Sequence, residues 1–552
     1  MFKENRKHLQ GTLFDYIGVS DKKKKKLENS KYKMFYDEIF CNIKETEFED
    51  MYSTLPSRPN YPVNILFGSL ILKHMRNWTF EKLFENVEFN LLTRTALGLN
   101  DFNEETFSDT TLFNFINYIS DYQISTGINL FEHVFDGLTK RQLKKFNIKT
   151  DIQRSDSFLA GSDICNYSRL QILVEILRRL YKNISEKEQK KFKDNFSRYL
   201  DKTSGQYVYQ LKKTNLEKEL EKIGRTYYVL NKGLKKKYNG MKIFEIFQRV
   251  FFEHFKIEDK KAIAIENKQL KSDILQSPDD EDATYRKKRN KMSKGYSVNV
   301  TETCNQKNDF NLITDIVVEP NIKDDSVILD ENLMKIKAKT PDLNELHSDG
   351  GYASEKVDEK MKSLGINQIQ TAIRGTKPDI RIDITKTGKD EYEISCPNQK
   401  VISKKTKTRY KAEFKESICL LCNKNKECKL QKQKNKRVLY FRKKDEIKRN
   451  RMKNKENLPK ERQNLRTNVE ATMNEFTCKL KNGKKLKVRT IFKAKMFAFL
   501  TGVGINFGRI YRNSKKVIKK DGNIAVLLKL YFSNIKIITK LLENIIYTKK
   551  FA

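Results

Sequence analysis

The order of hydrophobic patterns between residues 148 and 373 constrains the fold most strongly. Apolar residues alternate with polar ones in several short segments, as they do in half-buried strands, and recur at helical spacing in others. The strand patterns cover residues 148–155, 296–300, 312–319, 343–347 and 368–373, and the helical patterns cover residues 327–336 and 354–365. This succession predicts an α/β domain in which helices cover the faces of a mixed sheet.

The chain before residue 146 has a different character. Residues 1–60 are polar, and we expect them to be only partly ordered. Residues 61–145 carry apolar side chains at helical spacing, and Thr79 and Ser108 or Asp109 are placed to cap helices. The pattern predicts an all-α N-terminal domain. Such a unit fits a helix-turn-helix reader of DNA and a bundle that only packs on the rest equally well.

The α/β domain is interrupted twice. Its first part is expected over residues 146–376, with a charged helical insertion at about 165–272. A basic, cysteine-bearing insertion follows at 377–455, and residues 456–512 complete the domain with a helix that begins at Pro459 and contains Glu470. Residues 513–552 are expected to form a basic, amphipathic tail.

The net charge of the chain is strongly positive. Its 552 residues include 111 Lys and Arg against 71 Asp and Glu, which gives +40, and the excess is spread over every region. A surface of this kind attracts nucleic acid, although a coding sequence rich in A and T would also enrich lysine. The first residues lack a secretory signal and no long apolar run is present, so we expect a soluble, intracellular protein without a membrane partner.

Two aspartates follow or end strand patterns, where the backbone fixes a side chain beside an open edge. Asp156 comes after the first strand pattern and Asp349 after the fourth. Carboxylates at such positions can hold Mg²⁺ or Mn²⁺ for phosphoryl transfer. Taken singly, each fits a cap, turn or surface residue better than a metal ligand, and Asp151, Asp163 and Asp342 are rivals for the two positions.

Several motifs together resemble those of a known family. They are Arg-Ser-Asp156-Ser, Gly295-Tyr-Ser-Val-Asn-Val, Leu346-His-Ser-Asp349-Gly-Gly-Tyr352 and Arg466-Thr-Asn-Val-Glu470. From about Pro62 to Arg512 the chain resembles DDE transposases of bacterial insertion sequences, whose third carboxylate lies in a Tyr-x2-Arg-x3-Glu-x6-Lys signature. The arginine and glutamate match, whereas Gln463 and Thr477 replace the tyrosine and the lysine.

The resemblance implies a ribonuclease H-like catalytic domain and a complete catalytic set. Asp156 and Asp349 would bridge two Mg²⁺ or Mn²⁺ ions, Glu470 would complete the second metal site, and Arg466 would contact a phosphate. The implied function is binding to the terminal inverted repeats of a mobile element, followed by cleavage and strand transfer. The implied partners are double-stranded DNA, at the element ends and the target, and a second copy of the chain in a homodimer on DNA, in the bacterial cytoplasm at the nucleoid.

Other interpretations remain open on the sequence. A nuclease of the same fold without strand transfer would have the same carboxylates, and Gln463 and Thr477 also suit an inactive DNA-binding transposon relic. Arg466 and Glu470 have the spacing of an ordinary helical ion pair. His347, two residues before Asp349, either orients a carboxylate or is simply packed.

Four cysteines lie in the second insertion. Cys419 and Cys422 form a Cys-x2-Cys pair, and Cys396 and Cys428 flank it, which is compatible with a structural Zn²⁺ site. The wider spacing between Cys422 and Cys428 also fits free thiols in a reducing compartment. The remaining cysteines, Cys41, Cys165, Cys304 and Cys478, are expected to be buried thiols.

Overall fold

The computed structural model describes residues 1–10, 16, 18–288, 290–371 and 382–521. The chain divides into two compact units. Unit 1 comprises residues 1–150, 302–314 and the chain from 499 onward, and unit 2 comprises residues 151–301 and 315–498. The predicted tail beyond residue 521 lies outside the described residues. Within the described parts, no helix combines the length and apolarity needed to cross a membrane.

Unit 1 contains the helices expected for residues 61–145. Thr79 accepts a hydrogen bond from the amide of Lys82, and Ser108 accepts one from the amide of Thr111, so both predicted caps are confirmed. Each cap satisfies an amide that the first helical turn leaves without a partner. The helices are α3 (Val63–Arg76), α4 (Phe80–Phe89), α5 (Leu91–Ala96), α6 (Asp109–Thr126) and α7 (Leu130–Lys145).

Residues 1–60 contribute more to unit 1 than their polarity suggested. They include α1 (Asp21–Glu28), α2 (Lys31–Glu38) and three 3-10 helices, η1 (Lys7–Leu9), η2 (Phe40–Asn42) and η3 (Glu45–Met51). Phe35, Phe40 and Phe48 are fully buried. These aromatic residues lie among lysines and acidic residues, so the average composition conceals an apolar face.

The C-terminal half of the long helix α19 (Ile491–Asp521) belongs to the core of unit 1. Phe507 packs against Phe35 at 5.4 Å between ring centroids. The side chain of Asn506 accepts from the amide of Ile313 at 2.8 Å and donates to its carbonyl at 2.9 Å. Unit 1 is therefore built from three separate segments, and removing the first 145 residues would expose the apolar side of α19.

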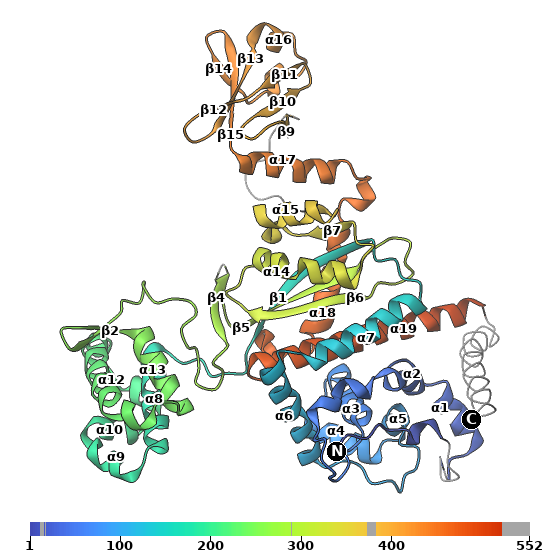
Figure 1. Ribbon diagram of the computed structural model, residues 1–552, viewed down its shortest axis with the longest axis vertical. Helices are drawn as coiled ribbons and strands as arrows, with labels where there is room; N and C mark the ends of the chain where they lie inside the picture. Colours follow the sequence, from blue (N-terminus) through green and yellow to red (C-terminus); the bar gives the residue numbers. More distant parts are fainter. Residues whose placement is uncertain (11–15, 17, 289, 372–381, 522–552) are drawn as a thin grey trace. The chain divides into compact units, whose positions relative to one another are not determined.

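Unit 2 is organised around a mixed sheet in the strand order β4-β5-β1-β7-β8, with β6 also paired to β5. β1 runs parallel to β7, and β7 runs parallel to β8, whereas β4 is antiparallel to β5. An α/β fold with a mixed sheet is therefore present (Figure 1). The strands are β1 (Ile152–Gly161), β4 (Thr284–Lys288), β5 (Lys291–Thr303), β6 (Ile313–Pro320), β7 (Glu345–Ser348) and β8 (Asn367–Gln370).

Two helices cover one face of this sheet. Leu329, Leu333 and Ile336 of α14 (Asp325–Lys339) share a core with Leu346 of β7 and with α15 (Glu355–Ser363). Leu346 alternates along β7 with Glu345 and His347, so these two residues face the opposite side of the sheet. That opposite side carries the candidate site.

The first strand differs from its predicted position. We expected it over residues 148–155, ending before Asp156, but β1 spans Ile152–Gly161 and Asp156 lies within it. The alternation of buried residues continues through Phe158 and Ala160. Asn147, with φ of 49°, separates the strand from α7. The predicted fifth strand was drawn to Ile373, whereas β8 ends at Gln370 and Ile373 lies outside the described residues.

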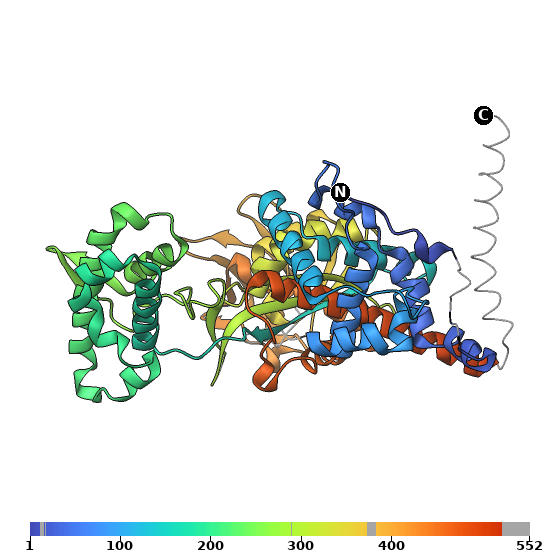
Figure 2. The same ribbon diagram turned by 90° about the horizontal axis from the view of Figure 1, so that it is seen from below.

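The first insertion folds around a core of its own. Helices α8 and α13 together with α12 supply most of its buried side chains, including Leu177, Tyr227 and Phe247. Both views show these helices gathered together (Figures 1 and 2). The insertion contains α8 (Arg169–Asn183), α9 (Glu186–Lys191), α10 (Lys193–Leu200), α11 (Ser204–Tyr209), η4 (Lys213–Asn215), α12 (Leu216–Tyr238), α13 (Lys242–His254) and the hairpin of β2 (Phe255–Glu258) and β3 (Lys261–Ala264).

The second insertion contains two small sheets and a short core that includes Tyr392, Phe414 and Phe441. We call residues 382–441 the cysteine subdomain. Its elements are β9 (Asp383–Lys386), β10 (Tyr392–Cys396), β11 (Gln399–Ile402), β12 (Lys404–Lys405), β13 (Tyr410–Lys415), α16 (Glu416–Leu420), η6 (Asn425–Glu427), β14 (Gln431–Gln433) and β15 (Lys436–Phe441).

The chain returns to the sheet through α17 (Lys443–Glu456). The helix expected to begin at Pro459 is divided into η7 (Lys460–Arg462), η8 (Leu465–Asn468) and a short α18 (Val469–Thr477). Val469, Met473 and Phe476 belong to the buried face of α18. A last 3-10 turn, η9 (Asn482–Lys484), precedes α19.

Candidate active site

Two neighbouring parallel strands bring Asp156 and Asp349 together. The register pairs Arg154 of β1 with His347 of β7. Asp156 lies two residues beyond Arg154, and Asp349 lies two residues beyond His347. Because side chains alternate along a strand, both carboxylates point to the same face at the same level of the sheet. Residues 193 positions apart in the sequence thus become neighbours.

Arg466 joins the two aspartates. Its Nη2 atom lies 2.9 Å from Oδ2 of Asp156 and 4.0 Å from Oδ2 of Asp349. Arg154 fixes the segment that carries this arginine, since its Nη1 donates to the carbonyl of Leu465 at 2.8 Å. The alternative interpretation of Arg466 as a simple helical ion-pair partner of Glu470 is wrong, because both of its ion pairs in the described residues are with the aspartates.

The loop after β7 holds Asp349 rigidly. The carboxylate of Asp349 accepts a hydrogen bond from the amide of Gly351 at 2.6 Å and so caps η5 (Gly350–Tyr352). Tyr352 is 2% exposed, and its hydroxyl donates to Oδ1 of Asn299 on β5 at 2.7 Å. The motif Asp349-Gly-Gly-Tyr352 is therefore a turn that is anchored at both ends.

The electrostatic environment of Asp156 combines opposing effects. The residue is 8% exposed, and burial raises the pKa of its carboxyl group. The charge of Arg466 and the hydrogen bonds from Ser157 and Arg466 lower the pKa again, while the negative charge of Asp349 raises it further. The net result is a raised pKa, so that the ionised form of Asp156 is destabilised in the folded protein.

Glu470 is not brought into contact with the two aspartates. It lies exposed in the first turn of α18, four residues after Arg466. Phe476, on the buried face of α18, packs against Phe158 of β1 at 5.6 Å, which holds the helix on the face that carries Asp156. Within the described residues, no three His, Cys, Asp or Glu side chains converge closely enough to form a finished metal site.

Two residues beside the site, Glu345 and Arg462, were not singled out from the sequence. Glu345 is buried and accepts from both His347 and Arg462, at 2.7 Å in each case. His347 is fully buried, and the carboxylate that its Nε2 atom contacts, at 2.7 Å, is that of Glu345. Burial raises the pKa of Glu345, but hydrogen bonds from His347 and Arg462 and their charges outweigh that effect and lower it. The period-two spacing of Glu345, His347 and Asp349 was the available signal.

This arrangement gives a prediction about stability. Because the pKa of Glu345 is lowered in the folded state, its stabilising effect is fully present above the pKa of an unfolded glutamate and is lost as the pH falls through the lower folded-state value. Glu345→Gln should therefore reduce the free energy of unfolding by about 1–3 kcal/mol at pH 7. The difference from wild type, measured by urea denaturation, should shrink below about pH 4. An equal difference at both pH values would contradict the assignment.

Asp325 is a third carboxylate near the pair. It is the first residue of α14, and burial raises the pKa of its carboxyl group, which a hydrogen bond from Ser157 and the charge of Arg286 lower and the charge of Asp349 raises. Its Oδ1 atom is buried and has no hydrogen-bond partner among the residues that the structure describes. The rival aspartates lie elsewhere: Asp163 pairs with Lys481 at 2.7 Å, and Asp342 is exposed.

The four cysteines of the second insertion line one small pocket. Cys396, Cys419, Cys422 and Cys428 surround it together with Gln399 and Arg437. Gln399 donates to Sγ of Cys419 at 3.2 Å. Burial raises the pKa of the Cys419 thiol, Arg437 lowers it, and the neighbouring Cys396 and Cys428 raise it.

The other cysteines only partly follow the prediction. Cys304 is buried as expected. Cys41, Cys165 and Cys478 are exposed, and the expectation of buried thiols was wrong for these three. A cysteine is apolar enough to favour the core but small enough to be tolerated at the surface, so composition alone did not decide its position.

Comparison with known proteins concerns the first unit. Residues 23–118 match the family model described as Transposase domain (DUF772). The matched segment begins within α1 and ends within α6. No curated protein and no solved structure matches the chain. The match supports a transposase on the evidence of this domain. Asp156, Asp349, Arg466 and Glu470 lie outside the matched residues.

Proposed function

We propose that the chain is a DDE transposase that binds the terminal inverted repeats of a mobile element, cuts the DNA at its ends and joins the freed 3′-hydroxyls to a target. The single observation that carries this proposal is the pair of aspartates on adjacent parallel strands that share Arg466. The transposase match of residues 23–118 supports it independently, because it concerns another part of the chain.

The chemistry of the donor set fits magnesium or manganese. Carboxylate oxygens are the ligands that these ions prefer, and Asp156 and Asp349 would hold them with Glu470 as the third carboxylate. Two such ions supply an activated water or 3′-hydroxyl and stabilise the leaving oxygen in phosphoryl transfer. Glu470 is exposed and lies one helical turn after Arg466, the arginine that contacts both aspartates.

Arg466 would change partners during the reaction. In the DNA-free protein its guanidinium neutralises part of the charge of Asp156 and Asp349. A phosphate at the same place offers two oxygen acceptors, which arginine binds in a bidentate manner. Arg466 would thus orient the scissile phosphate while Arg154 keeps its backbone in place.

A ribonuclease H-like fold for unit 2 is part of the proposal. Its supports are the mixed sheet, the position of Asp156 on the central strand β1, and Asp349 directly after the neighbouring strand β7. The two insertions fall between strands or after the sheet, where extra chain does not disturb pairing.

The decisive experiment is an end-joining assay. Duplex DNA taken from the regions that flank the coding sequence is incubated with the protein, Mg²⁺ and a target plasmid. A transposase yields both nicked ends and covalently joined products. Cleavage without joined products would support the nuclease alternative, and binding without cleavage would support the inactive relic.

The charge of the chain predicts a strong effect of salt on DNA binding. Each neutralised phosphate contributes about −0.9 to the slope of log K against log salt concentration. With +40 net charge, the slope should correspond to several phosphate contacts. Fluorescence anisotropy between about 50 and 200 mM salt should show a loss of affinity by about 10³-fold or more. A nearly salt-independent affinity would contradict this mode of binding.

We also propose that Cys396, Cys419, Cys422 and Cys428 hold a structural Zn²⁺ ion. The pocket that the four side chains line together supports four-thiolate ligation, and Cys396 and Cys428 are near enough to Cys419 to raise the pKa of its thiol. The ion would brace a subdomain whose apolar core is small.

A further inference from the structure

A cleft opens beside the Asp349 loop. Its walls include Arg286 of β4, the glycines Gly350 and Gly351, Gln370 at the end of β8, and Lys444, Lys448 and Arg451 of α17. We call it the α17 cleft. Glycine removes side-chain bulk and allows a ligand to approach the backbone closely, here directly next to Asp349.

A buried amide in this cleft lacks a partner. Gln370 is 1% exposed, and its Nε2 atom makes no hydrogen bond within the described residues. A buried donor without an acceptor destabilises the folded protein. A ligand that accepts a hydrogen bond from Nε2 of Gln370 would explain why the amide lies there. The amide of glutamine is among the groups that bind phosphate oxygens in protein–DNA complexes.

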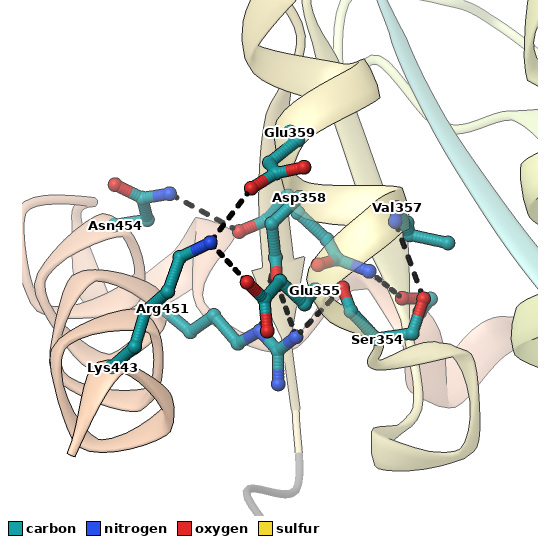
Figure 3. A network of polar contacts seen from close by, with 10 residues as sticks. Ser354, Glu355, Val357, Asp358, Glu359, Lys443, Arg451 and Asn454 are labelled. Atoms are coloured by element: carbon teal, nitrogen blue, oxygen red, sulfur yellow. Dashed lines mark hydrogen bonds and ion pairs between the residues drawn. The ribbon is translucent and has the colours of Figure 1, made fainter.

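Polar contacts hold α17 at the cleft (Figure 3). Arg451 donates through Nε to Asp358 of α15 at 3.0 Å and through Nη2 to the carbonyl of Ser354 at 3.2 Å. Lys443 pairs with Glu355 and, at 3.0 Å, with Glu359. The buried residue of α17 is an arginine, Arg449. Ion pairs thus attach this helix to α15, which follows the Asp349 loop.

At the α17 side of the cleft, the two lysines Lys444 and Lys448 outnumber the single carboxylate of Asp445, so an anion is favoured there. Asp324 is paired with Arg286 at 3.3 Å, and Asp445 accepts from the amide of Arg442 at 2.8 Å. Lys444 is exposed on α17, and Lys448 lies one turn further along the same helix. The remaining acidic wall residue, Asp325, lies towards Asp349.

We propose that the α17 cleft binds the phosphate backbone of the DNA strand that is cut, next to the scissile phosphate. Lys444 and Lys448 neutralise phosphates, and Nε2 of Gln370 donates to a phosphate oxygen. The proposal rests on the proposed function for the identity of the strand. It makes α17 a positioning element that links the cysteine subdomain to the catalytic carboxylates.

The test compares three variants with wild type in DNA binding. The double variant Lys444→Gln/Lys448→Gln should make the salt slope less steep by about 1–2, at about 0.9 per lost phosphate contact. Gln370→Met should weaken binding about threefold to tenfold without lowering the unfolding temperature, because it removes a donor that is unsatisfied in the free protein. Lys356→Gln, on the exposed side of α15, is the matched control and should change neither quantity.

Neutral methylphosphonates locate the contact. A single methylphosphonate is placed at each position of the cut strand in turn. It should weaken DNA binding by the wild-type protein at one or two positions beside the cleavage site. At the same positions it should not weaken DNA binding by the Lys444→Gln/Lys448→Gln variant. If both cleft variants bind DNA with the affinity and the salt slope of wild type and still cut it, the role proposed for the cleft is wrong, whereas the proposed function is unaffected. DNA that is bound but never cut would instead refute the function, and the binding comparison would still decide the role of the cleft.

Discussion

Asp156→Ala and Asp349→Ala should each lower the rate of DNA cleavage by about 10³-fold or more, since a metal carboxylate stabilises the transition state by several kcal/mol. Glu470→Ala should have an effect of the same order if Glu470 is the third carboxylate. DNA binding should stay within about twofold, because phosphate contacts from Lys and Arg are retained. Cleavage of radiolabelled end DNA under single-turnover conditions measures the rate, and anisotropy measures binding.

Asp342→Ala provides the control for this series, because Asp342 is an exposed aspartate close in sequence to Asp349. Its cleavage rate should equal that of wild type. Near-normal cleavage by one of the three carboxylate variants would remove that residue from the site. Should Glu470→Ala retain activity while both aspartate variants lose it, Asp325 becomes the residue to examine as the third carboxylate.

Asp156 should favour activity at the expense of stability. Because the pKa of Asp156 is raised in the folded protein, its ionised form costs free energy at neutral pH. Asp156→Asn should therefore unfold at the same or a higher temperature than wild type at pH 7 while losing activity. The stability difference should vanish below about pH 4, where the carboxyl group is protonated in both states.

The second large effect concerns the cysteine subdomain. Purified protein should contain about one Zn²⁺ per chain, and Cys419→Ser/Cys422→Ser should lose it, because the thiolates of this pair are half of the proposed ligand set. Atomic absorption on freshly purified protein measures the metal. Protease sensitivity of residues 382–441 should rise in the same variant, since the small core would lose its brace.

The control for the zinc experiment replaces exposed cysteines outside the pocket. Cys165→Ser/Cys478→Ser should keep the metal and the protease resistance. Folded wild-type protein without zinc would refute the metal site. The four thiols would then be free side chains that share a pocket.

Sequence patterns predicted local features well. The caps Thr79 and Ser108 depend on residues only a few positions apart, and both are present. The start of β1 was misplaced because apolar residues occur both just before the strand, at Ile148, and in the strand itself. Only the pairing of residues 152–154 with β7 fixes where the strand begins.

Long-range pairing was not accessible from the sequence. The spacing of Arg466 and Glu470 suggested a local ion pair, whereas the arginine binds an aspartate 310 residues away. Glu345 and His347 share a strand face by simple alternation, but nothing local indicated Arg462 as their third partner. Such contacts depend on the tertiary fold, which places charged groups by packing and not by spacing.

The separation between the residues of the site has a consequence for synthesis of the protein. Arg154 contacts a carbonyl 311 residues later, so the aspartate pair receives its arginine only after most of the chain has left the ribosome. Contacts of such long range form late in folding. A chain that ends before residue 466 would therefore lack the arginine that joins the two aspartates. Under the proposed function, such incomplete chains would be unable to cut DNA.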